Sequence, residues 1–163
     1  MGFNLNLFFG LCRNSCKIKY NNLFLSILFP ILAVTIIWIY LLCGLEKSYI
    51  SDFTIYHKIY SVGITPLIEE IAFRGIFLGM FFIELPKYLL KENQYRFWKY
   101  PIMVSGLLLV TVYFSFSHNY NLDLRYISGL LFGIFYLLDK QNLLPSILGH
   151  AINNFIVIFI AHC

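Results

Sequence analysis

Three ionisable side chains lie within six residues of one another in an otherwise apolar stretch of the sequence. They are Glu69, Glu70 and Arg74. In a helix, Glu70 and Arg74 share one face and can form an ion pair, whereas Glu69 lies about 100° away. Two neighbouring carboxylates shielded from water resist double ionisation, and such a pair is suited to general acid–base chemistry near neutral pH. Taken alone, the segment also fits a helix-packing ion pair without chemistry.

Two histidines and an asparagine follow in later apolar stretches. His118 comes after the run 114–117, while His150 and Asn154 stand four positions apart and would project from one face of a helix. With the carboxylates, they can supply a base that takes a proton from water and donors that stabilise an oxyanion, as amide hydrolysis requires. Taken singly, His118 also fits an interfacial histidine, and the other two fit an interhelical hydrogen bond. No serine in these stretches is placed for a Ser-His-Asp triad.

The helices that position these groups are expected to lie in a membrane. The chain has 163 residues, of which 60% are hydrophobic and 12% charged, with a mean hydropathy of +0.75. A soluble domain is roughly 25% charged, and a small soluble domain cannot bury so much apolar surface. The composition excludes a soluble globular domain, a disordered chain and a nucleic-acid-binding protein. The cysteine spacing shows neither a zinc-finger pattern nor a disulfide framework.

The hydropathy pattern predicts an all-α protein, a polytopic membrane bundle of about five transmembrane helices. A span needs about 20 mainly apolar residues. The predicted spans are 23–43, 59–82, 101–117, 124–138 and 143–161, and a tight connection at 139–142 joins the last two. We expect residues 1–22 to form an N-terminal cytoplasmic or interfacial segment and residues 23–163 to form one membrane-embedded domain.

The charged cluster in the span 59–82 cannot face lipid. A central Asp, Lys or Arg costs about 2.5–3.5 kcal/mol on an insertion scale, and a strongly apolar residue returns only about 0.3–0.6 kcal/mol. Three such groups would cost roughly 8–10 kcal/mol, of which the apolar neighbours offset about half. Glu69, Glu70 and Arg74 must therefore face other helices or a wet cavity. An ionisable residue in such a place is a functional-site hypothesis by default.

Lysines and arginines in the connections predict the orientation of the chain. The side that carries more of them is expected to be cytoplasmic, which places the N-terminus inside the cell and the C-terminus outside. That side holds Arg13, Lys17, Lys19, Lys87, Lys91, Arg96, Lys99 and Lys140, against Lys47, Lys58 and Arg125 on the other. Within 86–100 the cations alternate with aromatic residues, which favours an anchor in the lipid headgroup layer. A role in substrate gating is the alternative.

The polar positions resemble three motifs of the CAAX protease and bacteriocin-processing (CPBP) family of intramembrane glutamic endopeptidases, which includes the CAAX prenyl endopeptidase. That family carries E-E-x-x-x-R, F-x-x-x-H and H-x-x-x-N on three successive core helices. The matching residues here are Glu69, Glu70 and Arg74, then Phe114 and His118, then His150 and Asn154. Each motif is weak alone, but all three occur in order, each on a predicted span.

The resemblance implies the chemistry of peptide-bond hydrolysis inside the bilayer. Glu69 would be the general base, helped by His118, and together they would activate water. His150 and Asn154 would form the oxyanion hole.

The resemblance also implies supporting residues. Glu70 and Arg74 would fix the geometry and charge of the first core helix, and Phe114 would pack beneath His118. No cofactor is implied. A metal-dependent protease is the alternative, because a glutamate and two histidines can bind a catalytic zinc. The chain has no H-E-x-x-H motif, however, and Asn154 is better suited to donating a hydrogen bond than to binding a metal.

The expected partners are a membrane-associated peptide or protein substrate and the lipid bilayer. No nucleic-acid partner is expected, and a homo-oligomer is possible. The expected location is the inner (plasma) membrane of a bacterium. Two other functions also stay open. One is a non-enzymatic membrane immunity or interaction protein that retains the protease core. The other is a small transporter or proton relay, which the lack of an inverted repeat disfavours.

Overall fold

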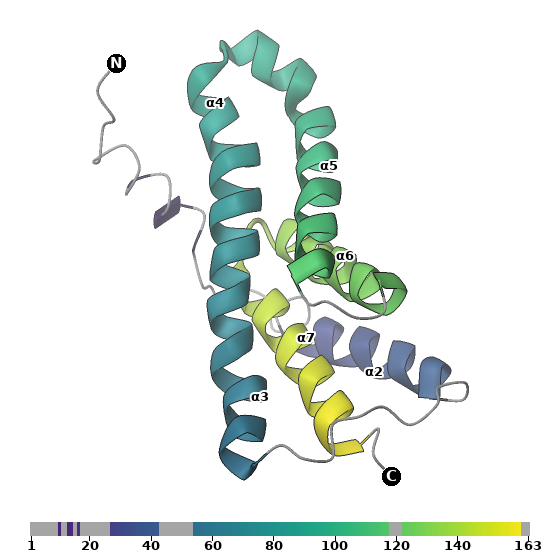
Figure 1. Cartoon of the computed structure of the whole chain (residues 1–163). Helices are drawn as coiled ribbons and strands as arrows, with labels where there is room; N and C mark the ends of the chain where they lie inside the picture. Colours follow the sequence, from purple (N-terminus) through teal and green to yellow (C-terminus); the bar gives the residue numbers. More distant parts are fainter. Residues whose placement is uncertain are drawn as a thin grey trace.

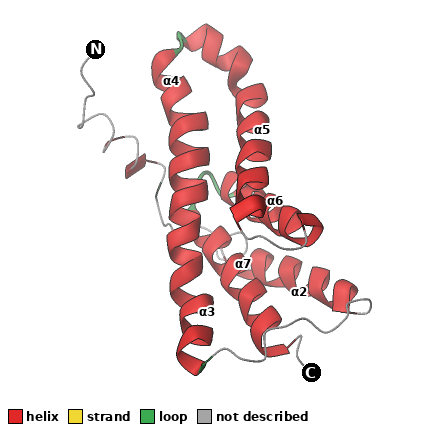
Figure 2. Cartoon of the chain, viewed as in Figure 1, coloured by secondary structure: helices red, strands yellow, loops and turns green. Residues whose placement is uncertain are grey.

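In the residues that it describes, the computed structural model is almost entirely helical. It describes residues 10, 13–14, 16, 27–42, 54–117 and 122–160, and within these ranges no strand occurs (Figure 2). The helices are α2 (Phe29–Leu42), α3 (Ile55–Glu70), η2 (Ile71–Glu84), α4 (Leu85–Leu89), α5 (Glu92–Ser117), α6 (Leu122–Leu138), α7 (Leu143–Phe155) and η3 (Ile156–Ile160). The predicted all-α architecture is confirmed.

A long helical column and α5 form an antiparallel hairpin. The helices α3, η2 and α4 follow one another directly through residues 55–89, and α5 returns alongside them (Figure 1). The helix α7 packs against α3, α2 packs against α7, and α6 packs against α5 and α7 (Figure 1). Within the described residues, α2, the column, α5, α6 and α7 with η3 make five helical elements, in agreement with the predicted number.

The hairpin helices extend beyond the predicted spans. The span 59–82 lies inside the 55–89 column, and α5 begins at Glu92 rather than at 101. Helical hydrogen bonds form between backbone groups, so a helix can continue into the basic and aromatic stretch that a hydropathy criterion rejects. Among the described residues, α5 is the one helix that is long and apolar enough by itself to cross a membrane, whereas 125–138 and 143–159 are shorter apolar helices.

The segment η2 follows directly on the glutamate pair and is π-helical. Its backbone hydrogen bonds reach five residues back, as from the N–H of Leu85 to the carbonyl of Met80. Such segments are rare, usually a single turn long, and frequent at functional sites. The backbone therefore changes from α to π geometry between Glu70 and Arg74, which no sequence signal predicted.

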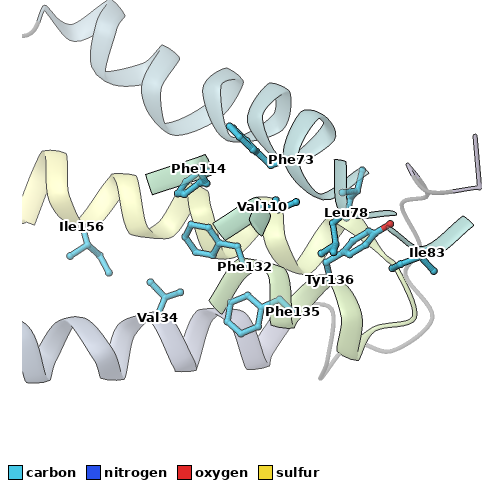
Figure 3. Packing of buried hydrophobic residues seen from close by; sticks show 11 residues of the cluster. Val34, Phe73, Leu78, Ile83, Val110, Phe114, Phe132, Phe135, Tyr136 and Ile156 are labelled. Carbon is cyan, nitrogen blue, oxygen red and sulfur yellow. The ribbon is translucent and has the colours of Figure 1, made fainter. Parts of the chain in front are cut away.

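Aromatic and aliphatic side chains from several helices fill the core between the hairpin and the other helices. In Figure 3, Phe114 and Phe132 lie near each other, and Tyr136 lies toward Leu78 and Ile83. The cluster comprises Val34, Phe73, Leu78, Ile83, Val110, Phe114, Phe132, Phe135, Tyr136, Leu143 and Ile156. Large apolar side chains also lie on the outside, with Leu109 60% and Phe116 62% exposed. Apolar surface of this kind fits helices that face lipid.

Gly106 allows α5 to approach η2 closely. A Cβ at this position would meet the ring and the Cβ of Phe82, at 2.6 Å from the latter. We expect Gly106→Ala to lower the free energy of unfolding by about 1–3 kcal/mol, the usual cost of overpacking, because Phe82 Cβ cannot move without its backbone. Thermal unfolding in detergent measures this loss. Gly63→Ala is the matched control, since its Cβ would meet nothing within 4 Å. Equal shifts for both variants would contradict the packing argument.

Candidate functional site

The structure places the two adjacent glutamates in different surroundings at the junction of α3 and η2. Glu70 is completely buried, whereas the side chain of Glu69 is 24% exposed. This difference follows from the rotation of about 100° between successive helical residues. Of the two side chains, that of Glu69 is the one partly open to the outside, although its Oε2 atom is buried.

Glu70 and Arg74 form a buried ion pair. Arg74 Nη1 donates to Glu70 Oε1 at 3.1 Å, and both residues are 0% exposed. Arg74 Nη2 donates to the backbone carbonyl of Gly129 in α6 at 2.7 Å. The pair expected from the i, i+4 spacing is therefore present. In addition, Arg74 connects the column to α6, a contact that the sequence did not indicate.

Three phenylalanine rings surround the guanidinium of Arg74. Its Cζ lies 4.6 Å from the ring centroid of Phe114, 5.6 Å from that of Phe132 and 5.9 Å from that of Phe73. A cation over an aromatic face is stabilised by about 2 kcal/mol or more where water is excluded. The rings therefore offset part of the cost of burying this charge and hold the guanidinium beside Glu70.

His150 joins α7 to both glutamates. Its Nδ1 lies 2.9 Å from Glu70 Oε1, and its Nε2 lies 3.6 Å from Glu69 Oε2. The ring stacks on Phe132 at 4.8 Å and meets Phe114 edge-on at 5.6 Å. Because an ionised carboxylate only accepts hydrogen bonds, we assign a proton to Nδ1, which donates to Glu70. The imidazole is thereby fixed with Nε2 turned toward Glu69.

A proton on His150 changes the charge balance of the cluster. The carboxylates of Glu69 and Glu70 lie near the permanent charge of Arg74, and an imidazolium at position 150 would add a further positive charge. Loss or gain of one proton changes the net charge of a site that excludes most water. Such a cluster is suited to holding and transferring a proton.

Asn154 lies one turn beyond His150 on α7 and binds α3. Its Nδ2 donates to the carbonyl of Ser61 at 2.9 Å, and its Oδ1 accepts from Asn153 Nδ2 at 3.4 Å. A side-chain amide has two N–H donors, so the contact with Ser61 uses one and leaves the other for a further acceptor. His150 and Asn154 thus fix α7 against α3 at two successive turns.

His118, the remaining predicted site residue, lies outside the residues that the structure describes. The end of α5 that precedes it does reach the site. The ring of Phe114 lies 5.2 Å from that of Phe73 and 5.6 Å from that of His150. The expected packing of Phe114 beneath His118 therefore stays a prediction. The structure shows in addition that Phe114 contacts Arg74 and His150.

Sequence reasoning missed the contribution of α6. Gly129 accepts from Arg74 through its backbone, and Phe132 stacks on His150. Neither residue type stands out in an apolar span. The one available signal was the spacing of Gly129 and Gly133, because small residues four apart mark faces where membrane helices approach closely. Added Cβ atoms at both positions would indeed meet side chains of α5.

The metal-dependent alternative requires two histidines, and one of them, His118, lies outside the described residues. No group of three His, Cys, Asp or Glu side chains in the described part of the chain is arranged to hold one. Glu70 Oε1 and His150 Nδ1 are already engaged with each other, and the guanidinium of Arg74 at 3.1 Å opposes the approach of a second cation.

Comparison with known proteins gives one match. A family model described as "Type II CAAX prenyl endopeptidase Rce1-like" matches residues 51–156, more than half of the chain. Searches of curated proteins and of solved structures gave no match. The matched range includes all six predicted site residues.

Proposed function

Because the chain belongs to the type II CAAX prenyl endopeptidase Rce1-like family, we propose that it hydrolyses a peptide bond of a membrane-associated peptide or protein with water activated by Glu69. At the level of the family, the protein is a CAAX-type intramembrane protease. One observation carries the finer proposal. The buried Glu70–Arg74 pair orients His150, whose Nε2 faces Oε2 of the partly exposed Glu69 side chain.

Glu69 is the candidate base. Its partial exposure allows water and a substrate carbonyl to approach, whereas Glu70 is buried and already binds Arg74 and His150. In the proposed step, Glu69 takes a proton from water, with His118 assisting, and the resulting hydroxide attacks the carbonyl carbon. The same proton then passes to the leaving amine, so that Glu69 returns to its ionised form.

His150 and Asn154 are the candidate oxyanion donors. A protonated His150 donates to Glu70 from Nδ1 and still has an N–H at Nε2, on the side of Glu69. The second N–H of Asn154 lies one turn away on the same helix face. Two fixed donors in a largely buried site stabilise the negative charge that develops on the carbonyl oxygen. In this proposal Glu70 and Arg74 are positioning residues.

A cleavage assay in liposomes tests the proposal. The purified protein is reconstituted and given two peptides of one sequence that ends in C-a-a-X, one with a prenyl chain on the cysteine and one without. We expect mass spectrometry to find a new peptide fragment from the membrane-associated form. If folded wild-type protein releases no fragment from either peptide, the proposal is overturned.

Removal of metal ions is expected to leave the cleavage rate unchanged. The reason is that Glu70 Oε1, a potential metal ligand, already accepts hydrogen bonds from Arg74 and His150. The rate is measured before and after dialysis against a strong chelator, with unfolding followed in parallel. A loss of activity that added zinc restores would show that the metal-dependent mechanism is correct.

We also propose that the turn between α4 and α5 lies in the headgroup layer on the cytoplasmic side, with the N-terminus on that side. Aromatic residues in the first turns of α5, next to this turn, are strongly exposed, with Phe97 at 73% and Tyr100 at 68%, and Lys99 lies over the ring of Tyr100. Exposed rings beside cations suit the membrane interface. The bacterial inner membrane is the proposed location.

A further inference from the structure

Ser146 is a completely buried polar residue of α7 to which the mechanism above gives no role. Its exposed fraction is 0%, and its Oγ donates to the backbone carbonyl of Phe132 in α6 at 2.7 Å. Ser146 and His150 are four residues apart in α7, so they share a helix face and are separated by about 6 Å along the axis. The serine hydroxyl therefore joins α7 to α6 one turn away from His150.

Phe132 connects this hydrogen bond to the imidazole of His150. The carbonyl of Phe132 accepts from Ser146, while its ring stacks on His150 with 4.8 Å between the centroids and 18° between the planes. Gly149 allows this approach, because an added Cβ there would lie 2.8 Å from the ring of Phe135 and 3.5 Å from that of Phe132. Both rings belong to the core cluster (Figure 3). Ser146, Gly149 and His150 thus contact the same turn of α6.

The stack on Phe132 determines where Nε2 of His150 points. The hydrogen bond from Nδ1 to Glu70 Oε1 at 2.9 Å fixes one point of the imidazole, but the ring could still rotate about that bond. Stacking on Phe132 fixes the plane of the ring. The two contacts together place Nε2 3.6 Å from Glu69 Oε2. A shift of α6 relative to α7 would therefore turn Nε2 away from Glu69.

The turn at 139–142 also holds α6 and α7 together. Asn142 Nδ2 donates to Asp139 Oδ2 at 2.7 Å, and Asn142 Oδ1 accepts from the N–H of Leu144 at 3.2 Å. His150 lies eight residues beyond Asn142, about 12 Å along the helix axis. Because a change in the angle between the helices at the turn grows with distance from it, the contact at Ser146 restrains His150 more closely than the turn does.

We propose that the hydroxyl of Ser146 is a positioning group, which fixes α7 against α6 so that His150 is aligned with Glu69. This inference rests on the proposed function, in which His150 stabilises the oxyanion. The rate of such a step depends steeply on geometry, and a misplacement of about 1 Å can cost about 10²-fold. Loss of the hydroxyl is therefore expected to change the cleavage rate far more than the stability of the fold.

A purely structural role for Ser146 makes a different prediction. In that case its loss would lower stability, but the protein that remains folded would keep the wild-type kcat. Ser115 provides the comparison, because it is also buried and its Oγ donates to a backbone carbonyl, that of Thr111 in the same helix, at 2.9 Å. Removal of either hydroxyl costs one buried hydrogen bond, but only the bond of Ser146 joins two helices of the site.

The experiment measures kcat and KM for peptide cleavage in liposomes and the unfolding temperature of each variant in detergent. We expect Ser146→Val to lower kcat by about 10- to 100-fold with little change in KM. Ser146→Thr has the shape of the valine variant but retains a hydroxyl, and it is expected to keep most of the wild-type kcat. Ser115→Ala is expected to lower the unfolding temperature about as much as Ser146→Ala does, but to leave kcat unchanged.

Two results would overturn the proposal. One is a wild-type kcat in Ser146→Val, and the other is an equal loss in Ser146→Thr and Ser146→Val, which would assign the effect to packing instead of the hydroxyl. If neither of these variants folds, Ser146→Ala is compared with Ser115→Ala. A loss of kcat in Ser146→Ala alone supports the proposal, and equal kcat values for the two alanine variants contradict it.

The orientation of His150 can also be followed without any cleavage. Nitrogen NMR of protein with isotope-labelled histidine shows which ring nitrogens carry a proton and whether their surroundings change. The chain has four histidines. The signals of His150 are those that none of the changes His57→Gln, His118→Gln and His162→Gln removes.

This measurement separates the proposal from the proposed function. If folded wild-type protein cleaves no peptide, the proposed function fails, and the role of Ser146 is decided by NMR. Signals of His150 that shift in Ser146→Ala but not in Ser115→Ala support the alignment of the imidazole by the hydroxyl. Signals that stay at their wild-type positions in Ser146→Ala show that the hydroxyl does not position His150.

Discussion

Glu69→Gln is expected to abolish peptide cleavage while the protein stays folded. Glutamine keeps the size of the side chain but cannot take a proton from water, and a general base contributes about 10²- to 10⁴-fold to a rate. Because Glu69 is 24% exposed and the buried pair of Glu70 and Arg74 is untouched, we expect little change in stability. The cleavage rate in liposomes and the unfolding temperature in detergent measure the two effects separately.

Glu92→Gln is the matched control for this variant. Glu92 is exposed at the start of α5, far along the hairpin from the site, and the substitution is chemically the same. We expect it to cleave at the wild-type rate. A Glu69→Gln protein that retains more than about a tenth of the wild-type rate, against the 10²-fold minimum expected of a base, would disprove the role of Glu69.

Arg74→Met is expected to destabilise the protein more than any other single change considered above. It removes the partner of a completely buried carboxylate, the contact with Gly129 and the cation between three phenylalanine rings. Breaking a buried ion pair by removing one partner costs about 3–5 kcal/mol. The free energy of unfolding in detergent measures the loss, and Arg96→Met is the exposed control.

The paired variant Glu70→Leu with Arg74→Met separates the ion pair from the rest of the loss. Replacing both partners by apolar residues leaves no uncompensated charge, so much of the stability is expected to return. Activity is expected to stay low, because His150 then lacks the carboxylate that orients it. An Arg74→Met protein as stable as Arg96→Met would show that the pair contributes little to folding.

The amino-acid sequence by itself determined the helical class, the placement in a membrane and the pairing of Glu70 with Arg74. These are consequences of local composition and spacing. An apolar stretch long enough to span lipid can be identified from its composition, whichever helices it packs against. Two side chains four residues apart lie close together in any helix. The cost of exposing charge to lipid also required Glu69, Glu70 and Arg74 to face inward.

Only the tertiary structure decided which groups from different helices meet. The positions of His150 between the two glutamates, of Asn154 against Ser61 and of Arg74 against Gly129 depend on the register and depth at which the helices pack. Two of these contacts end on backbone carbonyls, which every residue type carries, so no side-chain pattern could identify them. The sequence named the candidate site residues, and the packing of α6 and α7 against the column fixed the distances among those that the structure describes, because helix register is set by shape complementarity over many residues rather than by any one of them.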